Sequence, residues 1–168
     1  ITDLMTASDA IAAEPYVDET RMGAVGASYG GYSVYMLAGK HQGRYKAFIS
    51  HCGTFDNRSW YGTTEEIFFA NKDLDGPYWK DYRAPSYNEF SPSSYVEKWD
   101  TPILIIQGQQ DFRVPENQSM QAFQAARLRG IESRMVLFPD ECHWVLKPQN
   151  SLLWHAEFYG WLDKYLKK

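Results

Sequence analysis

Residues 21–32 read RMGAVGASYGGY, and this stretch decides the fold. The small apolar run at residues 22–25 is typical of a buried strand, and residues 33–38 are typical of a helix. Between them, GASYGG at residues 26–31 predicts a tight strand-to-helix turn. Such a turn lifts the Ser28 hydroxyl away from its own backbone, so that a neighbouring base can activate it.

The glycines and the tyrosine of this turn have expected roles of their own. Side chains at Gly26 and Gly30 are expected to collide with neighbouring backbone, and the backbone N–H of Tyr29 is expected to point at a developing oxyanion. A glycine-rich turn also occurs where two elements merely pack closely or where a phosphate binds, and the motif alone leaves that alternative open. The partners of Ser28 therefore have to come from the rest of the chain.

Downstream of the turn, short apolar runs alternate with amphipathic stretches, which favours parallel strands separated by helices. Three further strands are expected, at residues 46–50, 102–106 and 134–138. The run at 46–50 is apolar without strict alternation, as a strand covered on both faces is. Helices are expected over residues 3–13, after Pro115 and at the C-terminus.

The two C-terminal helices carry apolar residues at helical spacing. In the crossover helix after Pro115, we expect Met120, Phe123 and Leu128 to fall near one face. The terminal helix is expected to pack on the sheet through one stripe, which comprises Leu152, Ala156, Tyr159, Leu162 and Leu166. Residues 54–99 are rich in aromatic residues with irregular spacing, and they are predicted to form short helices over one end of the sheet that shape a pocket.

A nucleophilic serine needs a histidine base that an acid orients, and both follow Ser28 in the chain. Asp111 comes after the strand at 102–106, and His143 comes after the strand at 134–138. The order serine, acid, histidine, with each residue beyond the end of a strand, is that of the α/β-hydrolase fold. The sequence therefore predicts an α/β fold in which Ser28, Asp111 and His143 form the catalytic set of a serine hydrolase.

Other residues compete less well for these roles. Asp140 and Glu141 are near His143 in a tight turn and would struggle to reach its far ring nitrogen. Cys142 has no second histidine to activate it and is expected to be a small buried residue. The other histidines are expected to be structural or solvent-facing: His41, His51 and His155.

Composition and charge bear on other classes of protein. The chain of 168 residues is 44% hydrophobic, which suffices for a core, and its net charge of −4 carries no basic stripe for nucleic acid. No apolar run approaches the roughly 20 residues that span a bilayer. No ligand cluster indicates a metal, and acyl transfer needs no cofactor, so neither is expected.

With these residues assembled, the chain resembles the catalytic domain of the prolyl oligopeptidase family of serine peptidases, which includes dipeptidyl peptidases and acylaminoacyl peptidases. The likeness runs essentially end to end and rests on residues 21–32, SP at 91–92, TPILI at 101–105, Gly108 with DFRVP at 111–115, and FPDECH at 138–143.

The resemblance implies a role for each residue of the site. Ser28 is the nucleophile, His143 the general base and acid, and Asp111 its orienter, while the backbone of Tyr29 donates to the oxyanion. It also implies that the side chains of Val114, Trp60 and Tyr61 line the pocket for the residue before the cleaved bond.

The likeness to bacterial dipeptidyl-peptidase-like members implies hydrolysis of peptides through an acyl-enzyme, with release of short N-terminal pieces. An esterase and a catalytically silent binding domain of the same fold stay open as alternatives. A peptide substrate is the expected partner, and a homo-oligomer is left open. The same likeness favours the periplasm, with the cytoplasm as the alternative.

Relatives in this family place several strands and a second oxyanion donor ahead of the nucleophile. Residues 1–168 are therefore expected to be the C-terminal half of a catalytic domain, with a mostly parallel sheet of about four strands. The upstream strands, and a β-propeller, are expected to belong to the same protein outside these residues. The strand that carries Ser28 is then expected to have an unpaired edge.

Overall fold

The computed structural model describes residues 1–167 and contains a four-stranded sheet in the order β1-β2-β3-β4. The strands are β1 (Gly23–Ala27), β2 (Ala47–His51), β3 (Ile103–Gly108) and β4 (Ser133–Phe138). Every pair is parallel, and Ile49 of β2 lies between Val25 of β1 and Leu104 of β3. The predicted strands are confirmed, with bounds shifted by a residue or two.

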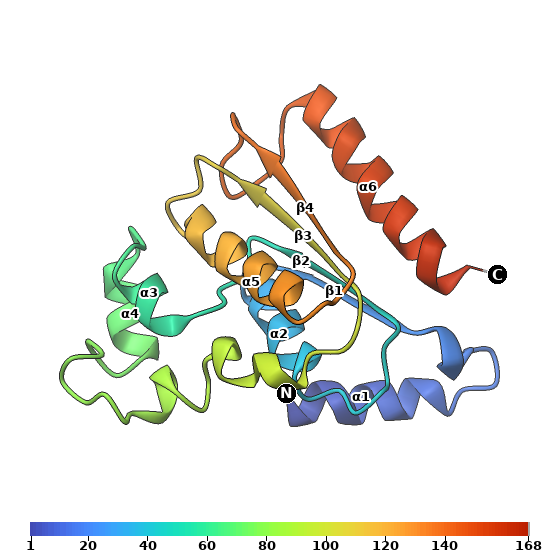
Figure 1. Ribbon diagram of the computed structural model, residues 1–168, viewed down its shortest axis with the longest axis horizontal. Coiled ribbons are helices and arrows are strands. Elements are labelled where there is room, and N and C mark those ends of the chain that lie inside the picture. The colour runs from blue at the N-terminus through green and yellow to red at the C-terminus, as the bar shows by residue number, and fades with distance from the viewer. Residues whose placement is uncertain (168) are drawn as a thin grey trace.

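Helices connect the strands and cover both faces of the sheet (Figure 1). The α-helices are α1 (Thr2–Ala12), α2 (Tyr29–Ala38), α3 (Asn57–Tyr61), α4 (Ile67–Asp73), α5 (Glu116–Leu128) and α6 (Pro148–Leu166). Shorter 3₁₀ helices lie at Glu19–Arg21, Pro85–Tyr87 and Pro92–Lys98. The predicted α/β fold class is confirmed.

Two apolar layers sandwich the strands, because successive side chains of a strand point to opposite faces. Phe48, Ile103 and Ile105 pack with residues of α2 and α5 on one face. Ile49 and Leu104 pack with α6 on the other face. The central strands β2 and β3 are buried throughout between these layers, which explains why their sequences lack strict alternation.

The crossover helix α5 meets the sheet through small side chains. Ala122 and Ala126 are fully buried, and Phe123 packs against the same core cluster. Met120 is 43% exposed and Leu128 is 78% exposed whereas Phe123 packs in the core, so the prediction that these three residues share one face was wrong. An alanine face lets the helix lie close to the strands, and its larger residues then turn toward solvent.

The terminal helix α6 covers the opposite face through a mainly aromatic stripe. This stripe comprises Trp154, Phe158, Trp161, Leu162, Tyr165 and Leu166. The prediction was correct for Leu162 and Leu166 and wrong for Leu152, Ala156 and Tyr159, which are exposed. The bulky rings fix the rotation of the helix, because they bury more apolar area than the smaller predicted stripe.

Residues 54–99 form the predicted excursion of short helices beside α5 (Figure 1). They have a small core of their own, which comprises Trp60, Tyr61, Ala70, Leu74 and Tyr87. Gln118 of α5 ties the start of this excursion to the sheet, because its Oε1 accepts hydrogen bonds from the backbone N–H groups of Phe55 and Asp56 at 3.0 and 2.9 Å. No local pattern in residues 116–128 indicates this role for the glutamine.

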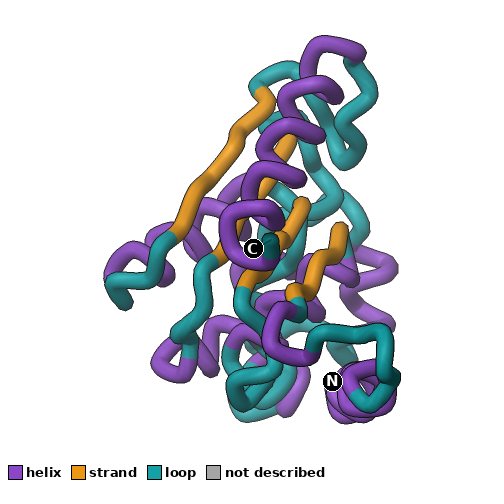
Figure 2. The backbone as a smooth tube through the Cα atoms, turned by 90° about the vertical axis from the view of Figure 1, so that its right-hand side faces the viewer, coloured by secondary structure: helices purple, strands orange, loops and turns teal. Residues whose placement is uncertain are grey.

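Helix α1 lies away from the loops that carry Asp111 and His143. Figures 1 and 2 place α1 at the opposite end of the strands from the loops that follow β3 and β4. Ile1 and Met5 pack against the core cluster, and Asp9 pairs with Arg44.

Within residues 1–167, no helix has the length and apolar character that a membrane span requires.

Candidate active site

Ser28 occupies a strained turn between β1 and α2. Its φ of 58° and ψ of −118° lie outside the usual regions for a residue with a side chain. The backbone N–H of Ser28 donates to the His51 carbonyl at 2.9 Å, which anchors the turn to β2. This is the conformation that presents a serine hydroxyl at the carboxyl edge of a parallel sheet.

The glycines around Ser28 explain how the turn closes. A Cβ atom on Gly26 would lie 2.3 Å from the Gly30 carbonyl oxygen, so the predicted clash at this position is confirmed. The predicted clash at Gly30 was wrong, since no described residue outside its own helix lies within 4 Å of a Cβ atom at that position. The second tight contact is instead at Gly31, where a Cβ atom would lie 2.7 Å from the Cα atom of Gly53.

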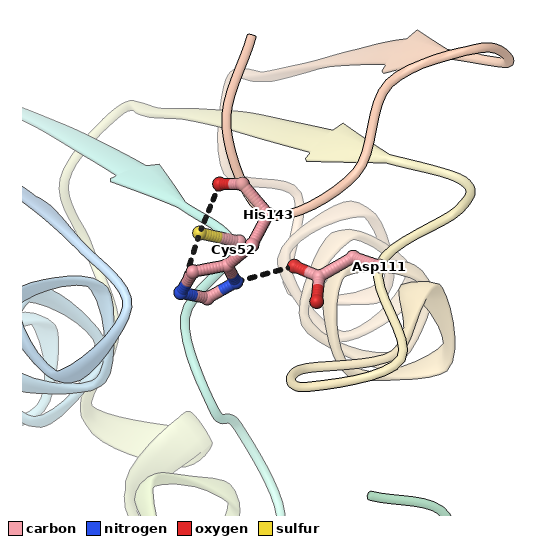
Figure 3. A group of neighbouring side chains, drawn as sticks. All are labelled: Cys52, Asp111 and His143. Atoms are coloured by element: carbon pink, nitrogen blue, oxygen red, sulfur yellow. Dashed lines mark hydrogen bonds and ion pairs between the residues drawn. The ribbon is translucent and has the colours of Figure 1, made fainter. Parts of the chain in front are cut away.

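Asp111 and His143 meet beyond the ends of β3 and β4, as Figure 3 shows. Nδ1 of His143 lies 2.7 Å from Oδ2 of Asp111, and both side chains are buried. The other carboxylate oxygen of Asp111 accepts the backbone N–H groups of Arg113 at 3.0 Å and Val114 at 2.9 Å. These bonds fix the direction in which the carboxylate meets the imidazole.

A buried glutamine supports the loop that carries Asp111. The amide nitrogen of Gln107 donates to the Val114 carbonyl at 3.0 Å and lies 3.4 Å from Asp111 Oδ2. Its amide oxygen accepts from the Ser119 hydroxyl at 2.7 Å. A polar residue at the end of an apolar strand was the available sequence signal, but only the fold shows what it contacts.

Asp140 and Glu141 do not contact the imidazole. Glu141 accepts the backbone N–H groups of Leu146 at 3.1 Å and Lys147 at 2.9 Å, while Asp140 pairs with the Lys147 amine at 2.6 Å. Both carboxylates thereby organise the turn that leads into α6. They are not placed to orient His143.

Cys52 is the residue at this site that the sequence analysis missed. Its sulfur lies 4.0 Å from His143 Nε2 and 3.7 Å from the His143 carbonyl oxygen (Figure 3). Cys52 follows β2 in a left-handed conformation with φ of 42°, and it is fully buried. The cysteine weighed from the sequence was Cys142, which proves to be exposed rather than buried.

The buried thiol of Cys52 is not poised to act as a nucleophile. Burial raises the pKa of this thiol to about 12, and the Asp111 carboxylate adds to the rise. A cysteine attacks as the thiolate, so a thiol that stays protonated at neutral pH is inert. The geometry of a cysteine-histidine pair is present here without the electrostatics that would activate it.

Ser28 lies close to the Cys52 thiol through its backbone. This backbone contact opposes the rise in the pKa of the thiol. Within residues 1–167, the Ser28 hydroxyl makes no hydrogen bond to His143. Catalytic hydrogen bonds are often long before substrate binds, so this geometry is compatible with a serine and base that close on a substrate.

A cavity of about 1220 Å³ opens beside Ser28. Tyr29, Trp60 and Val114 are among its lining residues, and the Trp60 ring nitrogen donates to the Arg113 carbonyl at 2.9 Å. Tyr61 is not among the lining residues. Its hydroxyl donates to the Asn71 side chain at 2.7 Å, because helix α3 directs this ring into the core of the excursion.

The other three histidines differ from His143 in their burial and in their hydrogen-bond partners. His41 is buried and lies 3.0 Å from the Asp100 carboxylate, whereas His155 is exposed on α6. His51 is buried at the end of β2, and its Nε2 atom has no hydrogen-bond partner among residues 1–167. Burial lowers the pKa of His51 to about 4, with a further contribution from nearby His143, so this ring is neutral.

The parallel sheet, the serine turn after β1, and the acid and histidine after β3 and β4 together define an α/β hydrolase. The chain belongs to the prolyl oligopeptidase family, which it matches over residues 1–168.

The curated relatives of this chain include two dipeptidyl-peptidases. Dipeptidyl-peptidase 5 of Porphyromonas gingivalis is 55% identical over 168 residues, which cover 99% of this chain and 25% of that protein. Dipeptidyl-peptidase 5 of Schizosaccharomyces pombe is 39% identical over 153 residues, which cover 90% of this chain and 22% of that protein. The chain thus spans about a quarter of the length of these relatives.

Solved structures share the fold. An acylaminoacyl peptidase of Pyrococcus horikoshii superposes with a TM-score of 0.90 at 24% identity, over 99% of this chain and 27% of that one. Dipeptidyl peptidase 4 of Porphyromonas gingivalis superposes with a TM-score of 0.85 at 22% identity, over 98% of this chain and 22% of that one. These likenesses establish the architecture of residues 1–167.

Proposed function

We propose that the protein containing this chain is a serine peptidase that releases dipeptides from the N-termini of peptides. Its catalytic residues in this proposal are Ser28, His143 and Asp111. The observation that carries the proposal is the buried 2.7 Å hydrogen bond between His143 and Asp111, in a fold that holds Ser28 on a strained turn. The 55% identity to a protein named dipeptidyl-peptidase 5 supports the substrate class.

The proposed mechanism follows from the hydrogen-bonding atoms. Asp111 accepts from the Nδ1–H of His143, so Nε2 carries the free lone pair and serves as the base. Nε2 takes the Ser28 proton as the serine oxygen attacks the peptide carbonyl, and it then gives that proton to the leaving amine. Water, activated by the same nitrogen, releases the acyl group and regenerates Ser28.

The oxyanion that forms during attack needs hydrogen-bond donors. Tyr29 is the first residue of α2, so its backbone N–H has no partner within the helix and supplies one donor in this proposal. Trp60 and Val114, which line the cavity beside Ser28, would contact the side chain before the cleaved bond. We propose that the second oxyanion donor comes from an upstream segment of the same protein.

The edge of the sheet supports this larger architecture. Among the described residues, β1 pairs only with β2, and Val25 on this edge strand is 48% exposed. We propose that strands ahead of residue 1 add to this edge, and that a β-propeller of the same protein restricts access to the site.

A homo-oligomer of the complete protein stays open, and light scattering of that protein would detect it.

We also propose a periplasmic location, on the resemblance to exported bacterial peptidases. Cell fractionation tests it: recovery of the protein with cytoplasmic markers would replace it with the cytoplasmic alternative.

The first test is active-site labelling of the full-length protein with a fluorophosphonate. We expect the label to map to Ser28, to disappear in Ser28→Ala and to persist in Ser151→Ala, whose hydroxyl lies on α6 near His155. Labelling that persists in Ser28→Ala would reject the assigned nucleophile. Absence of labelling in the wild-type protein would favour the silent binding domain.

The second test is substrate preference. We expect cleavage of dipeptidyl amides with a free N-terminus, and loss of cleavage when that amine is blocked. Hydrolysis restricted to simple carboxylic esters would favour the esterase. Cleavage of N-terminally blocked peptides would instead show an endopeptidase.

A further inference from the structure

Cys52 lies against the proposed base without taking part in the proposed reaction. Its backbone N–H donates to the Ile106 carbonyl at 2.9 Å, which holds the residue between β2 and β3. Its sulfur faces the Nε2 atom of His143 at 4.0 Å, and Asp111 lies on the far side of the ring (Figure 3). A thiol, an imidazole and a carboxylate therefore converge at one buried point.

The imidazole presents the correct atom to a metal ion. Asp111 accepts from Nδ1 of His143, which leaves the lone pair of Nε2 free, and the Cys52 sulfur lies 4.0 Å from that nitrogen. A histidine that binds a metal through one nitrogen commonly donates the other N–H to a carboxylate, which fixes the ring and increases its basicity. Asp111 makes this contact with Nδ1 of His143.

The separation of the ligand atoms also suits a small ion. The potential ligand atoms of Cys52, Asp111 and His143 lie within 4.8 Å of one another. Tetrahedral zinc, with bonds of about 2.3 Å to sulfur and about 2.0 Å to nitrogen, places these two ligands about 3.5 Å apart. The 4.0 Å between Cys52 Sγ and His143 Nε2 is longer than that value by about half an ångström, so the two side chains need to approach only slightly to bind the ion.

The charges match a divalent ion as well. Once deprotonated, Cys52 would carry one negative charge and Asp111 another, which together balance a charge of 2+. Thiolate and imidazole are both ligands that zinc prefers, whereas Mg²⁺ and Ca²⁺ prefer oxygen. The donor set therefore selects a thiophilic ion.

We propose that Cys52 Sγ and His143 Nε2 together bind Zn²⁺, that Asp111 orients the histidine for this purpose, and that the bound ion inhibits the enzyme. Binding forms a sulfur–zinc and a nitrogen–zinc bond, and the thiol proton passes to solvent. Water or the Ser28 hydroxyl fills the remaining positions. Inhibition follows because the ion occupies the lone pair that the proposed mechanism uses, so this part of the inference depends on the proposed function, whereas the binding does not.

The binding test uses the metal-free full-length protein in three forms: wild type, Cys52→Ser and Cys142→Ser. The exposed Cys142 is the matched control for loss of a thiol. We expect equilibrium dialysis to show Zn²⁺ affinity weakened at least tenfold in Cys52→Ser and unchanged in Cys142→Ser. With Co²⁺ as the probe, the thiolate-to-cobalt charge-transfer band should be present in wild type and Cys142→Ser and absent in Cys52→Ser.

The inhibition test measures residual peptidase activity against Zn²⁺ concentration, with each protein normalised to its own metal-free rate. We expect the half-inhibitory concentration to rise at least tenfold in Cys52→Ser, and a chelator to restore wild-type activity. Equal Zn²⁺ affinity and equal inhibition in wild type and Cys52→Ser would overturn the proposal. Binding through Cys52 in a protein without peptidase activity would reject the proposed function and keep the metal site.

A measurement on the wild-type protein guards against a variant that fails to fold. Crystals soaked in Zn²⁺ should show an anomalous-scattering peak between Cys52 Sγ and His143 Nε2. A fully occupied zinc elsewhere, with no peak at this position, would overturn the proposal without reference to any variant.

Discussion

In the proposed mechanism, the carboxylate of Asp111 acts on catalysis through the imidazole that it orients. Its two oxygens are committed, one to His143 and the other to the backbone N–H groups of Arg113 and Val114. An asparagine of the same shape would keep much of this geometry and remove the charge that stabilises the imidazolium. A single atom exchange therefore separates the electrostatic role of this residue from its packing.

We expect Asp111→Asn to lower kcat of the full-length protein by about 10³- to 10⁴-fold. Steady-state kinetics on a dipeptidyl amide checks this, with Asp140→Asn as the control because Asp140 contacts Lys147 rather than His143. A loss below tenfold in Asp111→Asn, or an equal loss in both variants, would contradict the role assigned to Asp111.

His51 makes stability depend on pH. Burial, followed by nearby His143, lowers its pKa to about 4 from the usual 6.5, while Asp111 opposes the shift. The unfolded chain therefore takes up a proton between pH 6.5 and 4 that the folded chain resists, so the free energy of unfolding falls as the pH falls through this window. The free energy of unfolding falls toward low pH because burial keeps this base in its neutral form.

We expect this contribution, of up to about 3 kcal/mol, to disappear in His51→Gln. The measurement is urea unfolding of wild type and His51→Gln at pH 7 and at pH 4.5. The loss of unfolding free energy between these two pH values should be smaller in His51→Gln than in wild type. His155→Gln is the control, since His155 is exposed on α6. A pH dependence that is identical in wild type and His51→Gln would show that this ring does not contribute.

At the scale of elements, α2 is held against the end of β2 by glycines. A Cβ atom on Gly31 would lie 2.8 Å from the His51 carbonyl oxygen as well as 2.7 Å from Gly53, both of which are backbone atoms. We expect Gly31→Ala to lower the free energy of unfolding by about 1–3 kcal/mol, because backbone must move to admit the methyl group.

Gly30→Ala is the matched control for that substitution. It lies one residue earlier in the same helix, where nothing outside the helix is within 4 Å, and alanine favours the helical conformation. Urea unfolding should show no loss of stability for this variant. Equal destabilisation by the two substitutions would mean that crowding between α2 and β2 is not the cause.

The aromatic stripe of α6 leads to a second element-scale prediction. Trp161 is buried at the centre of the layer between α6 and the sheet, whereas Leu152 on the same helix is 75% exposed. We expect Trp161→Ala to cost about 3–5 kcal/mol of unfolding free energy. Leu152→Ala should change it by less than about 0.5 kcal/mol.

Chemical denaturation of both variants checks this prediction. The opposite order, with Leu152→Ala the more destabilising, would mean that α6 packs through the stripe expected from its sequence spacing instead of the one in the structure.

For the molecule as a whole, the free edge of β1 is the main liability. Its outer backbone groups have no strand partner among the described residues, and Val25 is half-exposed there. An unpaired edge strand is a template for pairing with another chain. We expect residues 1–168 produced alone to self-associate, and Val25→Lys to weaken that association because an edge lysine opposes strand addition.

Sedimentation over a range of concentrations measures this, and Leu152→Lys serves as a control with a lysine at an exposed position away from the edge. A segment that stays monomeric at every concentration would show that the edge is protected by its own chain.

Local patterns in the sequence determined the parallel strands, the serine turn, and the placement of Asp111 and His143 after β3 and β4. This was sufficient because the carboxyl ends of parallel strands share one edge of the sheet, so that residues following separate strands come together. The close approach at Gly26 was also predictable, since it arises within a few residues of chain.

Only the tertiary structure decided which side chains meet across elements. The spacing of α5 and α6 was compatible with several inward faces, and the size of the side chains opposite each helix selected one of them. The contact of Cys52 with His143 likewise joins residues 91 positions apart. Sequence periodicity specifies the direction of a side chain relative to its own helix or strand, whereas contacts between elements depend on how both are rotated when the core closes.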